Sequence, residues 1–163
     1  MRVAFRRVRA GDLKRLNGIV NDPGVSRYLT LIPPVSMKDS RRFLGEVKRN
    51  RWRWYCVLVD GEVAGGVSLM PKRKNTKQSH VADVGIDLAR EYWGRGLGLK
   101  AFRFVVREAR AAGVRRLELQ VVRENKRARR LYEKAGFREE GVKRKAFKIG
   151  GRYHDTVMMA RLL

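Results

Sequence analysis

The sequence predicts an α/β fold with a mixed, largely antiparallel central sheet. The hydrophobic fraction is 44% over 163 residues, which is enough for a packed core. Helical periodicity at the start gives way to a β meander over residues 51–88, and strands then alternate with helices up to a final hairpin. A meander pairs its strands antiparallel, whereas a strand–helix–strand unit pairs them parallel, so the sheet is mixed. Because no interdomain linker interrupts this order, we expect one domain over residues 1–163.

The individual elements follow from apolar spacing and from turn residues. Apolar residues recur at helical spacing from Asp12 to Val20, and Ser36 opens a second helix with a variant of the capping box. From residue 51 the period changes to two, and Asp60-Gly61 is typical of a hairpin turn. We expect helices over 12–20, from 36 to near 50, from the glycine loop to 113 and over 125–136, and strands over 52–59, 62–70, 80–88, 114–122, 138–149 and 152–162.

The net charge is unusual. Lys and Arg number 39 against 16 Asp and Glu, which gives a formal charge of +23. Such a surface attracts polyanions, so it indicates an RNA, ribosome or DNA partner, or else a compositional preference for arginine with the charges on solvated faces. The basic residues are spread along the chain, and only residues 72–77 form a local basic loop, which weakens the nucleic-acid interpretation. No long apolar run or signal-peptide core is present, so we expect a cytoplasmic protein with no membrane partner.

A glycine-rich segment lies between an apolar strand and a helix. Gly94, Gly96 and Gly98 alternate there, and glycines before a helix allow a phosphate to approach unpaired backbone amides. Arg95 can add a mobile positive charge. The spacing differs from the dinucleotide fingerprint, and no GKS or GKT ending of a Walker loop follows. Alone, the segment predicts either a phosphate site or a tight turn.

A downstream segment distinguishes these alternatives. Residues 122–137, with the sequence VRENKRARRLYEKAGF, closely resemble the second signature of the GNAT (GCN5-related N-acetyltransferase) family, and the glycine loop resembles that family's acetyl-CoA motif. Residues 82–94 and the tail at 151–159 resemble the branch that contains ribosomal-protein and polyamine acetyltransferases. Trp93 stands where the family usually has Gln or Arg, a substitution common in this branch. The resemblance implies a GNAT-like sheet with helices on both faces, and it is weak over the opening helices.

The resemblance also assigns the residues that hold acetyl-CoA. A splayed strand would pair its backbone with the pantetheine arm and turn one amide to the thioester oxygen. The loop and the first turn of the following helix would hold the phosphates. Asn125 is used at the cofactor in the family, although a role as helix N-cap explains it fully. The expected cofactor-binding residues are Ile86, Asp87, Leu88, Gly94, Arg95, Gly96, Leu97, Gly98, Leu99 and Asn125.

Tyr132 is the candidate general acid. It lies two helical turns after Asn125 on the same face, where the family has a tyrosine, and a phenol stays protonated at neutral pH. Its apolar neighbours also fit a core tyrosine. For the base, Asp83 is the first candidate and Glu118 the second, because Gln120 occupies a position where related enzymes often carry glutamate. A water chain without a single base is the third alternative.

The remaining residues limit the chemistry. Cys56 lies in an apolar row and is expected in the core rather than as an acyl acceptor. His80 and His154 have no partners at ligand spacing, so we expect no metal, although His154-Asp155 is a candidate to shape the acceptor pocket. The expected activity is acetyl transfer from acetyl-CoA to an amine. The acceptor stays open between a protein N-terminus, including a ribosomal one, and a polyamine or aminoglycoside-like amine. A non-catalytic RNA-associated module is a further alternative, and a homodimer is an open possibility.

Overall fold

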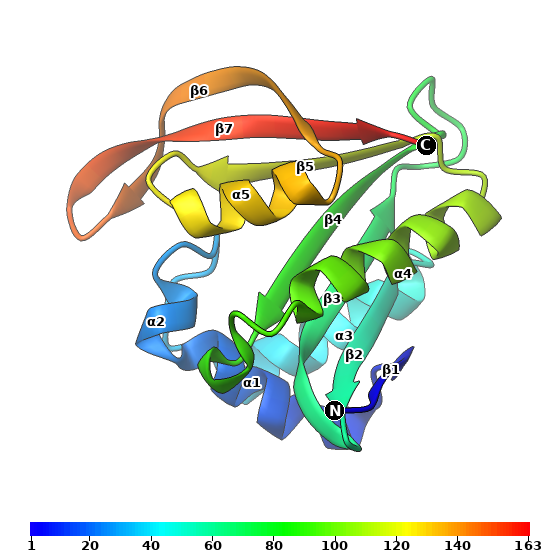
Figure 1. The fold of residues 1–163 in the computed structure, drawn as a ribbon, viewed down its shortest axis with the longest axis vertical. Helices are drawn as coiled ribbons and strands as arrows, with labels where there is room; N and C mark the ends of the chain where they lie inside the picture. The colour runs from blue at the N-terminus through cyan, green and yellow to red at the C-terminus, as the bar shows by residue number, and fades with distance from the viewer.

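A computed structural model describes residues 1–163 and contains one seven-stranded sheet with helices on both faces (Figure 1). The strand order is β1-β2-β3-β4-β5-β7-β6. All neighbouring strands pair antiparallel except β4 and β5, which pair parallel. This confirms the predicted mixed sheet. The elements are β1 (Val3–Arg7), α1 (Leu13–Asn21), α2 (Pro23–Ser26), α3 (Met37–Arg49), β2 (Arg53–Val59), β3 (Glu62–Pro71), β4 (Val81–Leu88), α4 (Leu97–Ala111), β5 (Arg116–Val122), α5 (Lys126–Lys134), β6 (Arg138–Ile149) and β7 (Arg152–Leu162).

Two elements were not predicted. β1 is an edge strand whose five residues include two arginines, and Arg6 points to Asp12 rather than to solvent, so its pattern does not alternate cleanly. α2 is only four residues long and lies where Asp22-Pro23-Gly24 indicated a chain break; Asp22 caps it by accepting from the Gly24 amide. Both elements depend on tertiary contacts more than on local pattern.

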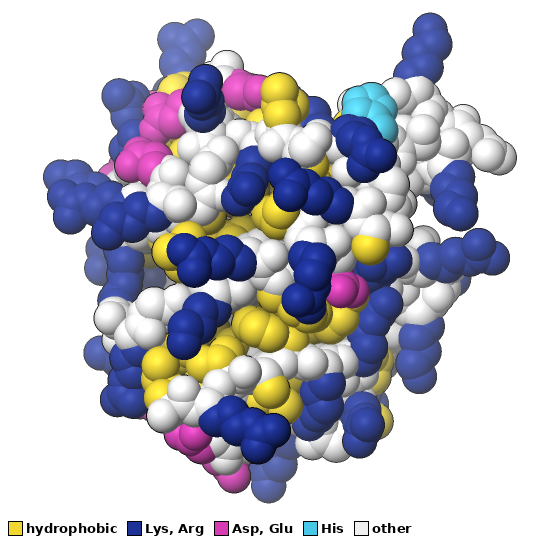
Figure 2. Space-filling view, turned by 45° about the vertical axis from the view of Figure 1, so that its right-hand side comes forward, with side chains coloured by type: hydrophobic (Ala, Val, Ile, Leu, Met, Phe, Trp, Pro, Cys, Tyr) yellow, Lys and Arg dark blue, Asp and Glu magenta, His cyan; other side chains and the backbone are white.

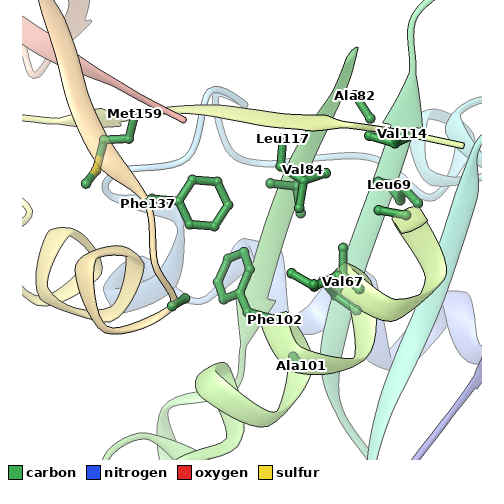
Figure 3. Close-up of a cluster of buried hydrophobic side chains, with 14 of the residues drawn as sticks. Val67, Leu69, Ala82, Val84, Ala101, Phe102, Val114, Leu117, Phe137 and Met159 are labelled. Atoms are coloured by element: carbon green, nitrogen blue, oxygen red, sulfur yellow. The ribbon is translucent and has the colours of Figure 1, made fainter. Parts of the chain in front are cut away.

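Two apolar layers cover the sheet. The main core lies between the sheet and α4, where Phe102 packs edge-on against Phe137 with ring centroids 5.4 Å apart (Figure 3). A smaller cluster lies on the opposite face under α1 and contains Leu16 and Cys56. Because β2 is covered on both faces, both of its alternating rows are largely apolar. The expected core position of Cys56 is confirmed, since its side chain is fully buried and burial raises its pKa to about 12.

The sheet opens at its centre. β4 and β5 pair only between Val81–Asp83 and Arg116–Glu118, and beyond these residues the two strands diverge (Figure 1). Each strand keeps its other neighbour, because β3 continues along β4 to Leu88 and β7 continues along β5 to Val122. The diverging edges therefore carry backbone groups without a strand partner.

Candidate active site

A cleft of about 1190 Å³ lies at the divergence of β4 and β5. The first turn of α4 and the inner face of α5 line one part of it, and residues 24–30 at and after α2 line another. The cleft also contains nearly all of the residues that the sequence suggested. Those that line it are Asp83, Ile86, Asp87, Leu88, Gly94, Gly96, Leu97, Gly98, Leu99, Glu118, Asn125 and Tyr132. Arg95 does not line it, and its guanidinium lies 5.7 Å from the centre of the Tyr92 ring.

The glycine loop has the geometry of an anion site. Gly94 and Gly96 have φ values of 75° and 73°, and a Cβ at either position would meet no atom within 4 Å. The first backbone bond into α4 runs from the Lys100 amide to the Gly96 carbonyl, 3.2 Å, which leaves the amides of residues 97–99 without a helical acceptor. Open space beside unpaired amides at a helix N-terminus suits a diphosphate, so the loop fits coenzyme A.

Gly98 has a different role from the two glycines before it. It is buried in the first turn of α4, and a Cβ there would lie 2.6 Å from Cδ2 of Leu131 on α5. Its missing side chain allows the two helices to approach. The third glycine of the loop is therefore explained by helix packing, which sequence spacing alone did not separate from phosphate binding.

The edge of β4 offers backbone groups to the cleft in an alternating manner. The Ala89 amide donates to the Ala64 carbonyl of β3, 2.9 Å, so the amide and carbonyl of Asp87 also point to β3, whereas those of Ile86 and Leu88 point away from it. The Asp87 backbone therefore faces β3 and not the cleft, contrary to expectation, and the backbone groups on the open edge are those of Ile86 and Leu88. The Leu88 carbonyl already accepts from the indole Nε1 of Trp93, 2.7 Å.

Trp93 also connects the loop with α5. The Arg127 guanidinium lies over the indole ring, 4.1 Å from the ring centre, which is a close cation–π contact. Trp93 thus takes part in two contacts, one with the end of β4 and one with α5. At this position, where the family usually has Gln or Arg, the tryptophan therefore connects the end of β4 with α5.

Tyr132 lies on the wall of the cleft. Its ring packs edge-on against Phe102 at 5.5 Å and against Phe137 at 6.1 Å, so part of it belongs to the core. Burial raises its pKa to about 12, and no hydrogen bond contributes to this shift. The phenol is therefore protonated at any physiological pH and has a free O–H to donate.

Asn125 caps α5, as its residue type suggested. Its side-chain oxygen accepts from the Ala128 amide, 3.2 Å. The residue also lines the cleft, and its side-chain NH₂ group donates to no protein acceptor. Capping and ligand contact are therefore compatible at this position.

Both carboxylates suggested as bases are held by cations. Asp83 forms an ion pair with Lys72, and Glu118 accepts from Arg116 Nε at 2.7 Å. Arg116 also binds Glu140 on β6, donating to it from Nη1 at 2.9 Å. A carboxylate held by a neighbouring cation is poorly placed to accept a proton from an incoming ammonium group.

The Asp87 carboxylate has a different environment. On β4, Ala82 and Val84 belong to the core under α4, so Asp83, Gly85 and Asp87 face the opposite side of the sheet. Oδ2 of Asp87 is buried and has no hydrogen-bond partner. Burial raises the pKa of Asp87 to about 7, and the Gly66 amide offsets this only in part.

Several cleft residues were not identified from the sequence. Arg127, Arg130 and Lys134 line the cleft from α5, and their spacing of three and four places them on one helical face, a signal that was available. Arg27 and Tyr28 follow α2, and no local pattern marked them. The pairing of β7 with β5 also brings Lys143 of β6 to the cleft, which only the sheet topology reveals.

The histidines stay outside the cleft. His154 Nδ1 lies 3.2 Å from Glu124 Oε1, and neither His80 nor His154 lines the cleft, so the suggestion that His154 shapes the acceptor pocket is not supported. No group of three or more His, Cys, Asp or Glu side chains is arranged to hold a metal ion. None of the helices combines the length and the apolar character needed to cross a membrane.

Comparison with known proteins agrees with this geometry. The model of the acetyltransferase (GNAT) domain matches residues 2–138. The chain is 32% identical to the L-amino acid N-acetyltransferase AaaT of Escherichia coli K12 over 105 residues, which are 64% of each protein. It is 28% identical over 162 residues to the spermidine N(1)-acetyltransferase of the same organism, covering 96% of this chain and 84% of that one.

A solved structure gives the same result for the fold. The spermidine N-acetyltransferase of Vibrio cholerae, solved in complex with CoA and spermine, superposes with a TM-score of 0.88 at 25% identity and covers 98% of this chain and 95% of its own. The family model spans most of the chain, and the cleft has the loop, the open strand edge and the tyrosine that the resemblance implied. The chain therefore belongs to the GNAT family of acetyl-CoA-dependent acetyltransferases.

Proposed function

We propose that the protein acetylates the α-amine of a polypeptide N-terminus, with Tyr132 as the proton donor to the leaving thiolate. Acetyl-CoA supplies the activated acetyl group. Ile86 and Leu88 would hold the pantetheine arm by their backbone groups, and the amides of residues 97–99 with Gly94 and Gly96 would hold the diphosphate.

The charge of the cleft supports this choice of acceptor. Four carboxylates line it, and three of them, on Asp83, Glu118 and Glu140, are paired with cations. Five basic residues that line it form no ion pair: Arg27, Arg127, Arg130, Lys134 and Lys143. A polyamine brings several positive charges, but three of the four cleft carboxylates are already paired, and Arg27 adds an unpaired positive charge. A single amine needs only one counter-charge, which the unpaired Asp87 can supply, and this is the observation that carries the proposal.

The charge of the whole surface points in the same direction. The chain carries +23, and Lys and Arg outnumber Asp and Glu on the face shown in Figure 2. Such a field repels free polycations and attracts polyanions. A protein tail displayed on an RNA-rich particle, such as a ribosome, combines an α-amine with an anionic surrounding.

The relatives support an α-amine without identifying it. AaaT is named for L-amino acids, whose reactive group is an α-amine, whereas the spermidine enzymes are named for a polyamine. An α-amine has a pKa near 8, so a usable fraction is neutral at physiological pH, whereas a primary alkyl amine near 10 is almost fully charged. An α-amine therefore needs less help from a base to become neutral than a primary alkyl amine does.

Tyr132 suits the donor role because it is protonated and free. Its raised pKa keeps the proton on the phenol, and its O–H has no competing acceptor in the protein. The same pKa makes the phenol a weak acid. Its hydrogen bond to the sulfur would stabilise the negative charge that develops as the C–S bond breaks, and transfer of the proton then completes the step.

A panel of acceptors tests the proposal by release of coenzyme A. The panel compares an alanyl peptide with blocked lysines, L-alanine and spermidine at low and high salt. We expect the highest kcat/KM with the peptide, and the lowest with spermidine at low salt. A preference for spermidine would assign the protein to polyamines. Absence of release with every amine, together with RNA binding that falls steeply with salt, would indicate the non-catalytic module.

A further inference from the structure

We propose that the carboxylate of Asp87, rather than Asp83 or Glu118, accepts the proton that the acceptor ammonium must lose before it attacks. The inference rests on the proposed acetyl transfer and names a catalytic residue for it. Asp87 was expected only to contribute backbone to the cofactor, and its backbone instead pairs with β3.

The two faces of the diverging strands differ in what an amine would meet there. Val84, Ile86 and Leu88 face α4, where Phe102, Leu131 and Tyr132 pack against the same core. That face is the part of the cleft that the first turn of α4 and α5 line, where the proposed cofactor site lies. The other face carries Asp83, Gly85 and Asp87, and residues 24–30 line the cleft beside it. An acyl group held along the edge of β4 lies roughly in the plane of the sheet, and a nucleophile approaches a carbonyl from above that plane. The open face is therefore the face of Asp87.

Only one of the candidate carboxylates is free of a cation. Asp83 is paired with Lys72, and Glu118 with Arg116. Asp87 has no cation at ion-pair distance, and its Oδ2 is buried without a partner. An unpaired buried carboxylate is costly, and natural proteins keep such groups mainly where they function.

Glycines make room for this carboxylate. A Cβ on Gly66 would lie 3.2 Å from Asp87 Oδ1 and 2.8 Å from the indole Nε1 of Trp54. Gly85 lies two residues before Asp87 on the same face. A Cβ on Gly85 would lie 3.1 Å from Ser68 Oγ, so the position has little room for a side chain. The carboxylate thus lies in a niche next to Gly66 and Gly85, on the face of β4 where the acceptor would bind.

The charged groups around the niche are either paired with one another or lie on the cleft side. Behind the niche on β2, burial keeps the Cys56 thiol protonated, with Asp87 itself adding to the effect. Beyond Cys56, Arg6 and Asp12 neutralise each other. On the cleft side lie Arg27 and Tyr28, together with the two paired carboxylates of β4 and β5. Arg90 lies two residues after the end of β4, and its Nη1 is 3.8 Å from Asp22 Oδ1.

The reaction moves three protons. Asp87 takes one proton from the bound ammonium, and the neutral nitrogen forms a bond to the acetyl carbon. The C–S bond breaks, the nitrogen loses its second proton to solvent, and the thiolate takes a proton from Tyr132. Solvent returns the proton to Tyr132 and removes the one on Asp87. Burial supports this role, since a carboxyl that titrates near pH 7 matches the task of a base at neutral pH.

Asp87→Asn tests the proposal, with Glu62→Gln, an exposed carboxylate at the start of β3, as the matched control. With an alanyl peptide, we expect Asp87→Asn to lower kcat at pH 7 by about 10²-fold or more, and the control to match the parent. A second acceptor, a peptide hydrazide that is unprotonated at neutral pH, removes titration of the nucleophile. With it, no proton has to be removed before attack, so the rate of Asp87→Asn should come within about threefold of the parent.

A spectroscopic readout separates this proposal from the acceptor assignment. In protein labelled with ¹³C at the aspartate carboxyls, the resonance that disappears in Asp87→Asn should titrate near neutrality. Alanyl peptide with coenzyme A should lower that midpoint, because an ammonium ion stabilises the carboxylate. If neither acceptor is acetylated but the midpoint still moves, the acceptor assignment is wrong and Asp87 remains the amine-binding carboxylate. With the alanyl peptide, a rate of Asp87→Asn within about threefold of the parent, an equally large defect with the hydrazide, or a midpoint that the peptide does not move overturns the proposal.

Discussion

Gly98 of α4 lies directly against Leu131 of α5, so closely that a Cβ on the glycine would be 2.6 Å from Cδ2 of the leucine. This contact fixes how near α5 comes to the first turn of α4. It therefore places Tyr132, the next residue on α5, against Phe102 at the wall of the cleft. One glycine thus couples the anion loop to the tyrosine.

Gly98→Ala should weaken both folding and cofactor binding. Overpacking of this kind typically costs about 1–3 kcal/mol of unfolding free energy. Gly18→Ala on α1 is the control, because a Cβ there meets no atom within 4 Å, and alanine should stabilise the helix by roughly 0.5–1 kcal/mol. Urea unfolding measures both. The double variant Gly98→Ala/Leu131→Ala should recover acetyl-CoA affinity relative to Gly98→Ala; if it does not, contact with Leu131 is not the cause.

Tyr132→Phe should lower kcat by about 10²-fold and leave acetyl-CoA affinity nearly unchanged, because only the hydroxyl is lost and the ring stays packed. Coenzyme A release gives kcat, and calorimetry gives the affinity. The pKa of about 12 also predicts that the parent loses no activity by ionisation of Tyr132 below about pH 10. Unchanged turnover in the phenylalanine variant would assign the residue to packing alone.

Asp87→Asn should make the protein more stable at neutral and higher pH. Because burial raises the folded pKa of Asp87 to about 7 from a usual value near 4, the folded state binds this proton more tightly. The parent's unfolding free energy should therefore fall as pH rises from about 4 to 7, by up to about 4 kcal/mol. The amide has no such dependence. Urea unfolding at pH 8 should show a more stable variant, and at pH 4 the two should agree. A variant less stable at pH 8 would contradict a buried, unpaired carboxylate.

The ion pair of Arg6 with Asp12 gives the opposite pH dependence. Arg6 donates two hydrogen bonds to the Asp12 carboxylate, 2.7 and 2.8 Å, and these lower the pKa of Asp12 to about 2. Its contribution is present above about pH 4 and lost as pH falls towards 2, so Asp12→Asn should cost about 2 kcal/mol at pH 7. Chemical unfolding between pH 2.5 and 7 measures this. An equal difference at both ends would show that packing, not charge, is responsible.

Local patterns predicted most of the fold. Period and turn residues located the long helices and the hairpin strands, including the turn at Gly150-Gly151 between β6 and β7. They did not locate β1, because Arg6 is satisfied by Asp12 some residues away, or α2, which has only four residues. β1 forms by pairing with β2, which is distant in the sequence, and α2 is too short to show a helical period.

The site was predictable to a similar extent. Nearly all of the residues that were expected from the glycine spacing and the tyrosine position lie in one cleft. What spacing could not show was which carboxylates are paired. Asp83 meets Lys72 only when the 71–80 loop has formed, and Glu118 shares Arg116 with Glu140 across strands. The backbone of Asp87 faces β3 because backbone groups alternate in direction along β4, and which residues face β3 depends on the register of the two strands.

Isothermal titration of acetyl-CoA into the protein shows whether this cleft is the cofactor site. We expect one site per chain, at least tenfold weaker binding in Gly96→Ala, where a methyl group would enter the anion loop, and unchanged binding in Gly61→Ala. Both glycines have positive φ and open surroundings, so the two variants carry the same kind of backbone strain, but Gly61 lies in the β2–β3 turn away from the cleft. No binding at millimolar acetyl-CoA, or equal affinity in both variants, would contradict the assignment of this cleft.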